Sequence, residues 1–340
     1  MNKFIFLVVS LTIVSCNSRL ESLIFKQFQK FIKKYKKNYS SINEFIARYN
    51  IFRNNIIQLY NSENKSYKTG ISKFFDLTKQ EFSKSFLNLN YDSIAAINNF
   101  NSSFVESTDE APEEWDWRDH GIVGKVFDIG NCNANWAYSV MGNLQSLYAL
   151  HYGTYEYFSP QMLIDCDTYD HGCDGVWLFE YTFTWLKENG GIMLESDYPY
   201  TGKKSTCKSD PSKYINMKVT GYKKLGNQYS TWLSPVDEET MKQFLYKNGP
   251  LTVALNANIL FSYRSGIIDV SRVNCPAEGV DHMALLVGYG IDDELKGKEY
   301  WIVQNFWGKN WGEGGYFRIK RGTEMCNINS YVFTGLVSFD

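Results

Sequence analysis

All but one of the cysteines of this chain lie in one section, and their number constrains how that section folds. Apart from Cys16, the chain has six cysteines, and all of them lie between positions 132 and 326. An even set of cysteines in an oxidising compartment is suited to disulfides, here three of them. We therefore expect this section to be a disulfide-stapled unit, although the residues alone do not decide which cysteines pair.

The N-terminus is typical of a secretory signal peptide. Asn2 and Lys3 precede an apolar run over residues 4–14, which ends at Ser15 and Cys16. This run is too short to span a bilayer. We therefore expect residues 1–16 to direct the chain to a secreted or lysosomal/vacuolar location. Acylation of Cys16, as in a bacterial lipoprotein, is the alternative.

The composition indicates a globular chain without a dominant charge. Its 340 residues are 44% hydrophobic and 16% aromatic, enough to bury the core of one large unit and an accessory one. A net charge of −2 gives no basic surface for nucleic acid or for an anionic membrane. His120, His151 and His171 have no cysteine or carboxylate at metal-ligand spacing, so we expect no metal and no cofactor.

Residues 17–110 form a separate section that is rich in lysine and asparagine and free of cysteine. Within it, five residues recur at intervals of three or four, a spacing that places them on one face of a helix. They are Glu44, Arg48, Phe52, Asn55 and Leu59. The section also holds three Asn-x-(Ser/Thr) sequons, at Asn38, Asn64 and Asn101, which predict glycosylation.

Beyond residue 110, helical patterns come first and strand patterns follow. The helical stretches are residues 135–152 before Gly153, a helix start at 158–161, and residues 176–189 before Gly190. The short apolar runs typical of strands are residues 251–255, 283–287 and 300–303. This order predicts an α+β fold, with helices in one lobe and an antiparallel sheet in the other.

Three separated segments carry motifs in a fixed order. Residues 132–136 read Cys-Asn-Ala-Asn-Trp, residues 280–284 read Val-Asp-His-Met-Ala, and residues 300–308 read Tyr-Trp-Ile-Val-Gln-Asn-Phe-Trp-Gly. The first resembles the papain and cathepsin signature Cys-Gly-(Ser/Ala)-Cys-(Trp/Tyr). The other two resemble the segments with the catalytic histidine and with the asparagine that orients it, here His282 and Asn305. Their distances along the chain from Asn135 are those expected in that family.

The chain therefore resembles the papain-like cysteine peptidases, of the cathepsin L or F type. The resemblance implies a two-lobed fold, with a helical lobe, an antiparallel β-barrel-like lobe and a cleft between them. It also implies three disulfides, Cys132 with Cys173, Cys166 with Cys207 and Cys275 with Cys326. If all six of these cysteines pair, none of them is left as a thiol nucleophile.

Two positions depart from the family in ways that remove its chemistry. The resemblance puts the nucleophilic cysteine at Asn135 and the glutamine that stabilises the oxyanion at Ile129. An amide does not ionise near neutrality and cannot replace a thiolate. Losing the nucleophile costs on the order of 10⁶ in turnover, and losing an oxyanion donor costs roughly 10²–10³. We expect the chain to be catalytically inactive.

The remaining cleft residues implied by the resemblance are Gly175, Val176, Asp281 and Trp307. Trp307 is expected to shield His282 and Asn305 from water. Without a nucleophile to deprotonate, His282 is expected to have a structural role. Val176 stands where a second glycine is usual, and a β-branched residue there restricts the backbone, so we expect a narrowed cleft.

The N-terminal section resembles the inhibitory propeptide of cathepsin L-like zymogens. The helical stripe matches one propeptide motif. Residues 70–76, Gly-Ile-Ser-Lys-Phe-Phe-Asp, match a second, with Ser72 where asparagine is usual. Residues 111–118 resemble a mature N-terminus. We therefore expect a signal peptide at 1–16, a helical propeptide at 17–110 and a papain-like domain at 111–340, with processing near 108–112.

These features favour a secreted, monomeric pseudopeptidase that binds its own propeptide, and a peptide, protein or cystatin-like inhibitor, without hydrolysing them. Two alternatives stay open. One is an active peptidase with another nucleophile such as Ser139, although Ser139 lies one helical turn beyond Asn135 and should point elsewhere. The other is a structural or storage protein on the same fold.

Overall fold

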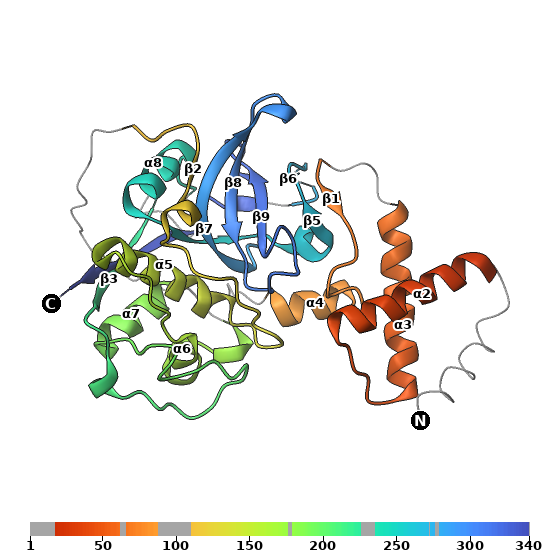
Figure 1. The fold of residues 1–340 in the computed structure, drawn as a ribbon, viewed down its shortest axis with the longest axis horizontal. Coiled ribbons are helices and arrows are strands. Elements are labelled where there is room, and N and C mark those ends of the chain that lie inside the picture. Colours follow the sequence, from red (N-terminus) through yellow and green to blue (C-terminus); the bar gives the residue numbers. More distant parts are fainter. Residues whose placement is uncertain are drawn as a thin grey trace.

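The computed structural model describes residues 18–61, 66–87, 110–175, 179–225, 235–271, 273–275 and 279–339. The predicted signal peptide, Cys16, Asn64, Asn101 and Val176 lie outside the described residues. Element labels are those of Figure 1, in which the N-terminal helices lie to one side of a larger body made of helices and a sheet. We call residues 18–61 and 66–87 the N-terminal region.

The N-terminal region is built on two long helices and a short one. Its elements are α2 (Ser18–Tyr35), α3 (Ile42–Asn61), β1 (Lys68–Thr69) and α4 (Lys79–Phe86). The helices α2 and α3 pack through aromatic rings, with Phe28 and Phe52 at the centre, their ring centroids 5.1 Å apart. The predicted stripe on one helix face is confirmed, because Phe52 and Asn55 on α3 are both buried.

The contacts of α3 fix how the chain returns toward α4. Asn55 Nδ2 donates to the carbonyl oxygens of Phe75 and Leu77, each at 2.9 Å. Arg48 Nη1 donates to both carboxylate oxygens of Glu81 on α4, at 2.9 Å and 3.0 Å. Figure 1 shows α4 between the crossed α2–α3 pair and the larger body. The N-terminal region therefore presents α4 and the segment before it to the rest of the molecule.

The helical lobe contains α5 (Asn135–Tyr152), α6 (Pro160–Cys166) and α7 (Phe179–Asn189). The helix predicted over residues 135–152 is confirmed, and Gly153 ends it with φ of 71°, a left-handed conformation that suits glycine. Ser159 caps α6 by accepting a hydrogen bond from the backbone N–H of Met162. Three short 3₁₀ helices also occur here: η1 (Trp117–His120), η2 (Gly172–Asp174) and η3 (Pro211–Lys213).

The second lobe is a sheet whose strands run in the order β3, β10, β4, β7, β8, β9 and β6, with β2 also pairing with β7. The strands are β2 (Trp115–Asp116), β3 (Lys218–Lys224), β4 (Leu251–Leu255), β6 (Ile267–Ile268), β7 (His282–Asp292), β8 (Lys298–Gln304), β9 (Tyr316–Lys320) and β10 (Val332–Ser338). The other elements are α8 (Glu238–Asn248), η4 (Asn258–Ser262), β5 (Tyr263–Ser265), η5 (Asp293–Leu295) and η6 (Met325–Asn327).

The predicted antiparallel sheet is confirmed for every pair in this order except one. The strands β6 and β9 run parallel, with Ile267 opposite Arg318. Their direction is not imposed by a hairpin, because these strands are far apart in sequence. The close approach of β2 to β7 depends on Gly288, where a Cβ atom would lie 2.5 Å from the carbonyl oxygen of Trp115.

The pairing of β7 with β8 places two of the predicted site residues side by side. Antiparallel pairing of β7 with β8 puts Leu285 opposite Gln304, so the start of β7 lies beside the end of β8. His282 begins β7 and Asn305 follows β8, which brings these two residues together.

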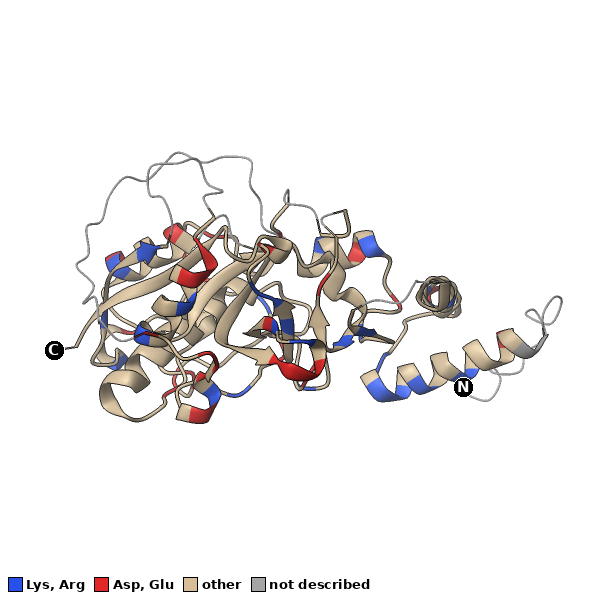
Figure 2. Ribbon diagram, turned by 90° about the horizontal axis from the view of Figure 1, so that it is seen from above, with Lys and Arg blue, Asp and Glu red and all other residues tan. Residues whose placement is uncertain are grey.

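Lys and Arg are interspersed with Asp and Glu along the ribbon in Figure 2. Within the described ranges, none of the helices combines the length and apolar character that crossing a bilayer requires.

Candidate active site

Asn135 lies at the N-terminus of α5 and is 3% exposed. Its Nδ2 atom donates to Asn133 Oδ1 at 2.7 Å and to the Phe86 carbonyl oxygen at 3.2 Å. A carbonyl oxygen only accepts, so the orientation of this amide follows from its neighbours. The site thus has an uncharged amide, and no thiol, at the position before Trp136.

A loop beside Asn135 is tied to the start of α5. The disulfide Cys132–Cys173 joins them, and the Asn133 N–H donates to the Cys173 carbonyl at 3.0 Å. The indole of Trp136 donates to the Gly172 carbonyl at 3.1 Å. Gly175 follows in the same loop with φ of 109°, a conformation that favours glycine. The narrowing of the cleft by Val176 stays a prediction, because that residue is outside the described part of the chain.

His282 and Asn305 are hydrogen-bonded to each other. His282 Nε2 lies 3.0 Å from Asn305 Oδ1, and the same oxygen accepts the backbone N–H of Phe306 at 2.8 Å. Since Phe306 fixes Oδ1 as the acceptor, Nε2 must carry the proton in this contact. The other ring nitrogen, Nδ1, lies 3.4 Å from the Phe86 carbonyl oxygen.

Burial lowers the pKa of His282 to about 4. The ring is 1% exposed, and the indole of Trp307 lies 4.8 Å away between ring centroids. Trp307 in turn packs edge-to-face against Trp311 at 5.0 Å. The hydrogen bond with Asn305 acts to raise the pKa of His282, but its effect is smaller than that of burial. At neutral pH the ring is therefore neutral, and the lone pair of Nδ1 faces the Phe86 carbonyl.

Ile129 occupies the position expected for the oxyanion donor, and its side chain is fully buried. Its backbone N–H donates to the Phe306 carbonyl at 3.0 Å, and its carbonyl accepts from the Tyr200 hydroxyl at 2.7 Å. Both backbone groups are therefore engaged within the protein. A hydrocarbon side chain adds no donor, so this position contributes no hydrogen bond to a developing oxyanion.

Asp281 precedes His282 but faces a different set of partners. Its two carboxylate oxygens accept from the Ala257 N–H and from Asn258 Nδ2, each at 2.8 Å. Burial raises the pKa of Asp281 to about 7 against the effect of these hydrogen bonds. The carboxyl group thus stabilises the turn at η4 rather than pairing with the imidazole.

The N-terminal region packs against Trp307 and lies in contact with Asn135 and His282. Phe74, Phe82 and Phe86 are all buried, and the rings of Phe74 and Phe82 contact the Trp307 ring edge-to-face at 4.9 Å and 5.6 Å. The Phe86 carbonyl points at Asn135 and His282. Sequence reasoning missed this contact. The one available signal was the recurrence of phenylalanine at positions 74, 82 and 86 in a polar section.

Polar contacts add to this docking of the N-terminal region. Ser72 Oγ donates to the Phe261 carbonyl at 2.5 Å, and Lys73 Nζ forms an ion pair with Asp128 at 2.6 Å. Ser72, noted above as a departure from the propeptide motif, thus still supplies a hydrogen bond at this position. Burial lowers the pKa of Lys73, and Asp128 opposes that shift.

The alternative nucleophile, Ser139, and two of the other histidines contact residues other than His282 and Asn305. Ser139 is fully buried, and its hydroxyl donates to the Ala284 carbonyl at 2.7 Å. His120 stacks on Trp115 and His151 stacks on Phe339. Among the described residues, no group of three or more histidine, cysteine, aspartate or glutamate side chains is placed to hold a metal ion.

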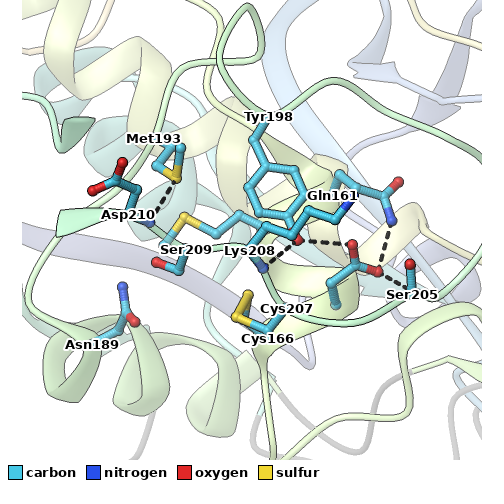
Figure 3. Close-up of a disulfide and its surroundings, with 12 residues drawn as sticks. Gln161, Cys166, Asn189, Met193, Tyr198, Ser205, Cys207, Lys208, Ser209 and Asp210 are labelled. Carbon is cyan, nitrogen blue, oxygen red and sulfur yellow. Dashed lines mark hydrogen bonds between the residues drawn. A yellow bond between two sulfur atoms is a disulfide. The ribbon is translucent and has the colours of Figure 1, made fainter. Parts of the chain in front are cut away.

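The other two disulfides are Cys166–Cys207 and Cys275–Cys326, so all three bridges are those that the family resemblance implies. Figure 3 shows Cys166–Cys207 beside Tyr198 and Gln161. The Tyr198 hydroxyl donates to Asp165 at 2.9 Å and accepts from the Lys208 N–H at 3.0 Å. This bridge thus holds a hydrogen-bonded loop against α6.

Comparisons with known proteins agree with the fold and with the N-terminal region. A family model described as "Papain family cysteine protease" matches residues 111–336, and one described as "Cathepsin propeptide inhibitor domain (I29)" matches residues 28–82. Cysteine proteinase 15A of Pisum sativum is 36% identical over 322 residues, covering 90% of this chain and 85% of that protein. A viral cathepsin of Choristoneura fumiferana nuclear polyhedrosis virus is 34% identical over 334 residues and covers 97% of each chain.

Solved structures extend the same likeness to three dimensions. The digestive procathepsin L 3 of Tenebrio molitor larval midgut superposes with a TM-score of 0.79 at 30% identity, covering 92% of this chain and 99% of that one. The recombinant stem bromelain precursor gives a TM-score of 0.75 at 30% identity. This chain therefore belongs to the papain family of cysteine proteases and carries a cathepsin propeptide inhibitor domain.

Proposed function

We propose that this chain is a secreted papain-family homologue that does not hydrolyse peptides, and that its cleft works as a peptide-binding groove. The observation that carries the proposal is the side chain at the start of α5. Asn135 stands there with its amide hydrogen-bonded to Asn133 and Phe86. An amide nitrogen has a delocalised lone pair and cannot replace the thiolate with which this family attacks a peptide carbonyl.

Two further observations support the absence of hydrolysis. The six cysteines from Cys132 to Cys326 are paired in disulfides, so none of them supplies a thiol. The hydroxyl of Ser139 is buried and donates to the backbone carbonyl of Ala284. His282, with its pKa lowered by burial, then has no nucleophile to deprotonate, and we assign it a structural role.

Contacts of the N-terminal region support the proposal that peptides bind at this site. The backbone carbonyl of Phe86, in the N-terminal region, already accepts a hydrogen bond from Asn135. The ring of Phe74, in the same region, packs against Trp307. We assign Gly175, Val176 and Asp281 to the same groove, and we expect processing near 108–112 to cut the connection between the N-terminal region and the papain-like domain. An external ligand would be an extended peptide, a protein segment or a cystatin-like inhibitor.

The test restores the missing chemistry. The processed protein and its Asn135→Cys, Ile129→Gln double variant are compared for hydrolysis of a fluorogenic dipeptidyl substrate, in a redox buffer mild enough to keep the disulfides. We expect cleavage by the double variant only. We also expect iodoacetamide to label the variant at position 135, and no cysteine from Cys132 to Cys326 in the wild type.

The control is a triple variant that adds His282→Ala to the double variant. It should lose the restored hydrolysis, because the thiolate then lacks the imidazole that activates it. Hydrolysis by the wild type that survives removal of contaminating proteases would contradict the proposal. A double variant that folds but does not cleave would show that the cleft has changed beyond these two positions.

A further inference from the structure

The Phe86 carbonyl oxygen is the point where the N-terminal region meets the catalytic position of the family. Two side-chain nitrogens lie close to it, Asn135 Nδ2 at 3.2 Å and His282 Nδ1 at 3.4 Å. These three groups are buried, so water does not replace a missing hydrogen bond there. The identity of the donor therefore matters for how firmly the N-terminal region is held.

His282 does not serve as that donor at neutral pH. Its Nε2 proton is directed at Asn305 Oδ1, and a neutral imidazole carries only one proton. The Asn135 amide supplies the hydrogen bond instead. Its second N–H donates to Asn133 Oδ1 at 2.7 Å, which fixes the orientation of the amide.

A cysteine at position 135 could not make the same contact. A thiolate only accepts hydrogen bonds, and its charge would lie beside the carbonyl dipole of Phe86. A thiol donates weakly. The asparagine thus replaces a poor or repulsive neighbour of this carbonyl with a good donor. Loss of peptidase activity and stronger retention of the N-terminal region follow from the same side chain.

We propose that Asn135 makes the nucleophile position a binding site for a peptide carbonyl, occupied by the chain's own Phe86, so that the N-terminal region stays bound after its connection to residue 110 is cut. This proposal rests on the proposed function, and it names the resident ligand of the groove. An external peptide or inhibitor must then displace the N-terminal region, including its aromatic contacts with Trp307 and the Lys73–Asp128 ion pair.

The experiment uses the full chain with a site-specific protease sequence inserted between residues 95 and 96. The folded protein is immobilised through a C-terminal tag and cut at pH 7.5, and the loss of the N-terminal fragment under buffer flow is followed over time. We expect the wild type to retain the fragment. Asn135→Asp keeps the shape but presents an acceptor to the Phe86 carbonyl, so we expect release faster by on the order of tenfold or more.

The matched control is Asn131→Asp. Asn131 is exposed and lies four positions before Asn135, so the same substitution adds the same charge nearby without altering the Asn133–Asn135–Phe86 contacts. Its release rate should stay within about threefold of the wild type. Asn135→Ala removes the donor without adding charge, and it should also release the fragment faster. It keeps the proposal testable if Asn135→Asp does not fold.

Rapid loss of the fragment from the wild type would overturn the proposal, and so would equal release rates for the Asn135 and Asn131 variants. Neither result bears on hydrolysis, because the Asn135→Asp and Asn135→Ala variants have no thiol to restore it. Conversely, peptidase activity in the wild type would overturn the proposed function while leaving the release rates as they are. The two ideas therefore fail separately.

Discussion

The His282 imidazole is hydrogen-bonded to Asn305 and lies near the Phe86 carbonyl oxygen, and both of these groups are uncharged. In a cysteine peptidase of this family, a thiolate and an imidazolium stabilise each other, whereas here Nδ1 of the ring faces the Phe86 carbonyl oxygen, to which the Asn135 amide also donates. Burial then dominates and lowers the pKa of His282 to about 4. We expect nuclear magnetic resonance titration of the imidazole to show a midpoint near that value.

Asn135→Cys supplies the comparison for this titration. A thiolate beside the ring favours the imidazolium, so the variant should titrate at a higher pH than the wild type. Both proteins are titrated in a His120→Gln, His151→Gln, His171→Gln background, in which His282 is the one histidine left. A wild-type midpoint near 6.5, the ordinary value for histidine, would contradict this account of the site.

The same pKa shift predicts how His282 affects stability. The unfolded chain protonates this histidine below about pH 6.5, while the folded protein stays neutral there until about pH 4. The unfolded state thus binds more protons in this window, and the free energy of unfolding falls as the pH falls. Across the window the loss amounts to about 3 kcal/mol.

Chemical denaturation between pH 4 and pH 7 checks this, with His282→Gln as the control. The variant lacks the ionisable ring, so it should lose less stability than the wild type on acidification. Asp281 acts in the opposite direction, because burial raises its pKa to about 7 and its ionisation then disfavours the folded state. Since Asp281 is present in both proteins, the difference between their slopes isolates His282. Parallel slopes would refute the prediction.

The pairing of His282 with Asn305 was predictable, because each residue lies in a recognisable sequence motif. The contact between Asn135 and Phe86 was not, because it joins residues 49 positions apart through packing that no local pattern encodes. For the same reason, the ion pair of Lys73 with Asp128 had no signal in the sequence.

Among single elements, α4 determines where Phe86 lies, and its N-terminus has a complete capping box. Thr78 Oγ1 accepts from the Glu81 N–H at 3.1 Å, and the Glu81 carboxylate accepts from the Thr78 N–H at 2.8 Å. We expect Thr78→Ala to lower the unfolding free energy of the N-terminal region by about 1 kcal/mol.

Urea unfolding followed at the N-terminal region would measure this loss. Ser85→Ala is the matched control, since Ser85 is exposed within α4 and alanine there is a better helix former. The control should be neutral or slightly stabilising. Equal stability of the two variants would mean that the cap does not contribute to holding α4 in place.

The helices that were predicted correctly are those whose ends carry strong local sequence signals. α5 and α6 were predicted because Gly153 and Ser159 mark their ends with recognisable chemistry. β7 runs to Asp292, well beyond the predicted stretch at 283–287, because its later residues pair with β8 rather than with β4. The helices α2 and α4 were not predicted individually. Their phenylalanines are buried by packing against α3 and Trp307, and local sequence patterns do not reveal this packing.

For the whole molecule, the disulfides restrict the unfolded chain more than any single contact does. Cys166 and Cys207 close a loop with a sequence separation of 41 residues. In the chain-entropy model, a loop of this size corresponds to about 4 kcal/mol of stability. We expect the Cys166→Ser, Cys207→Ser double variant to lose an amount of this order in denaturant unfolding.

The control for the disulfide variant is Ser205→Ala, in the same loop and without effect on the bridge. Ser205 is exposed and contributes its backbone N–H to Asp165, which alanine retains. This variant should unfold with the wild-type midpoint. A double cysteine variant as stable as the wild type would show that the hydrogen bonds around Tyr198 hold this loop without the bridge.

The short pairing of β1 with β5 joins the N-terminal region to the rest of the molecule by backbone hydrogen bonds. Lys68 lies opposite Ser265, and the Gly70 N–H donates to the Ser262 carbonyl at 2.9 Å. If the N-terminal region left, β5 would become an open strand edge, and such edges invite pairing with other chains. The N-terminal region therefore also covers a strand edge that its departure would leave open to pairing with another chain.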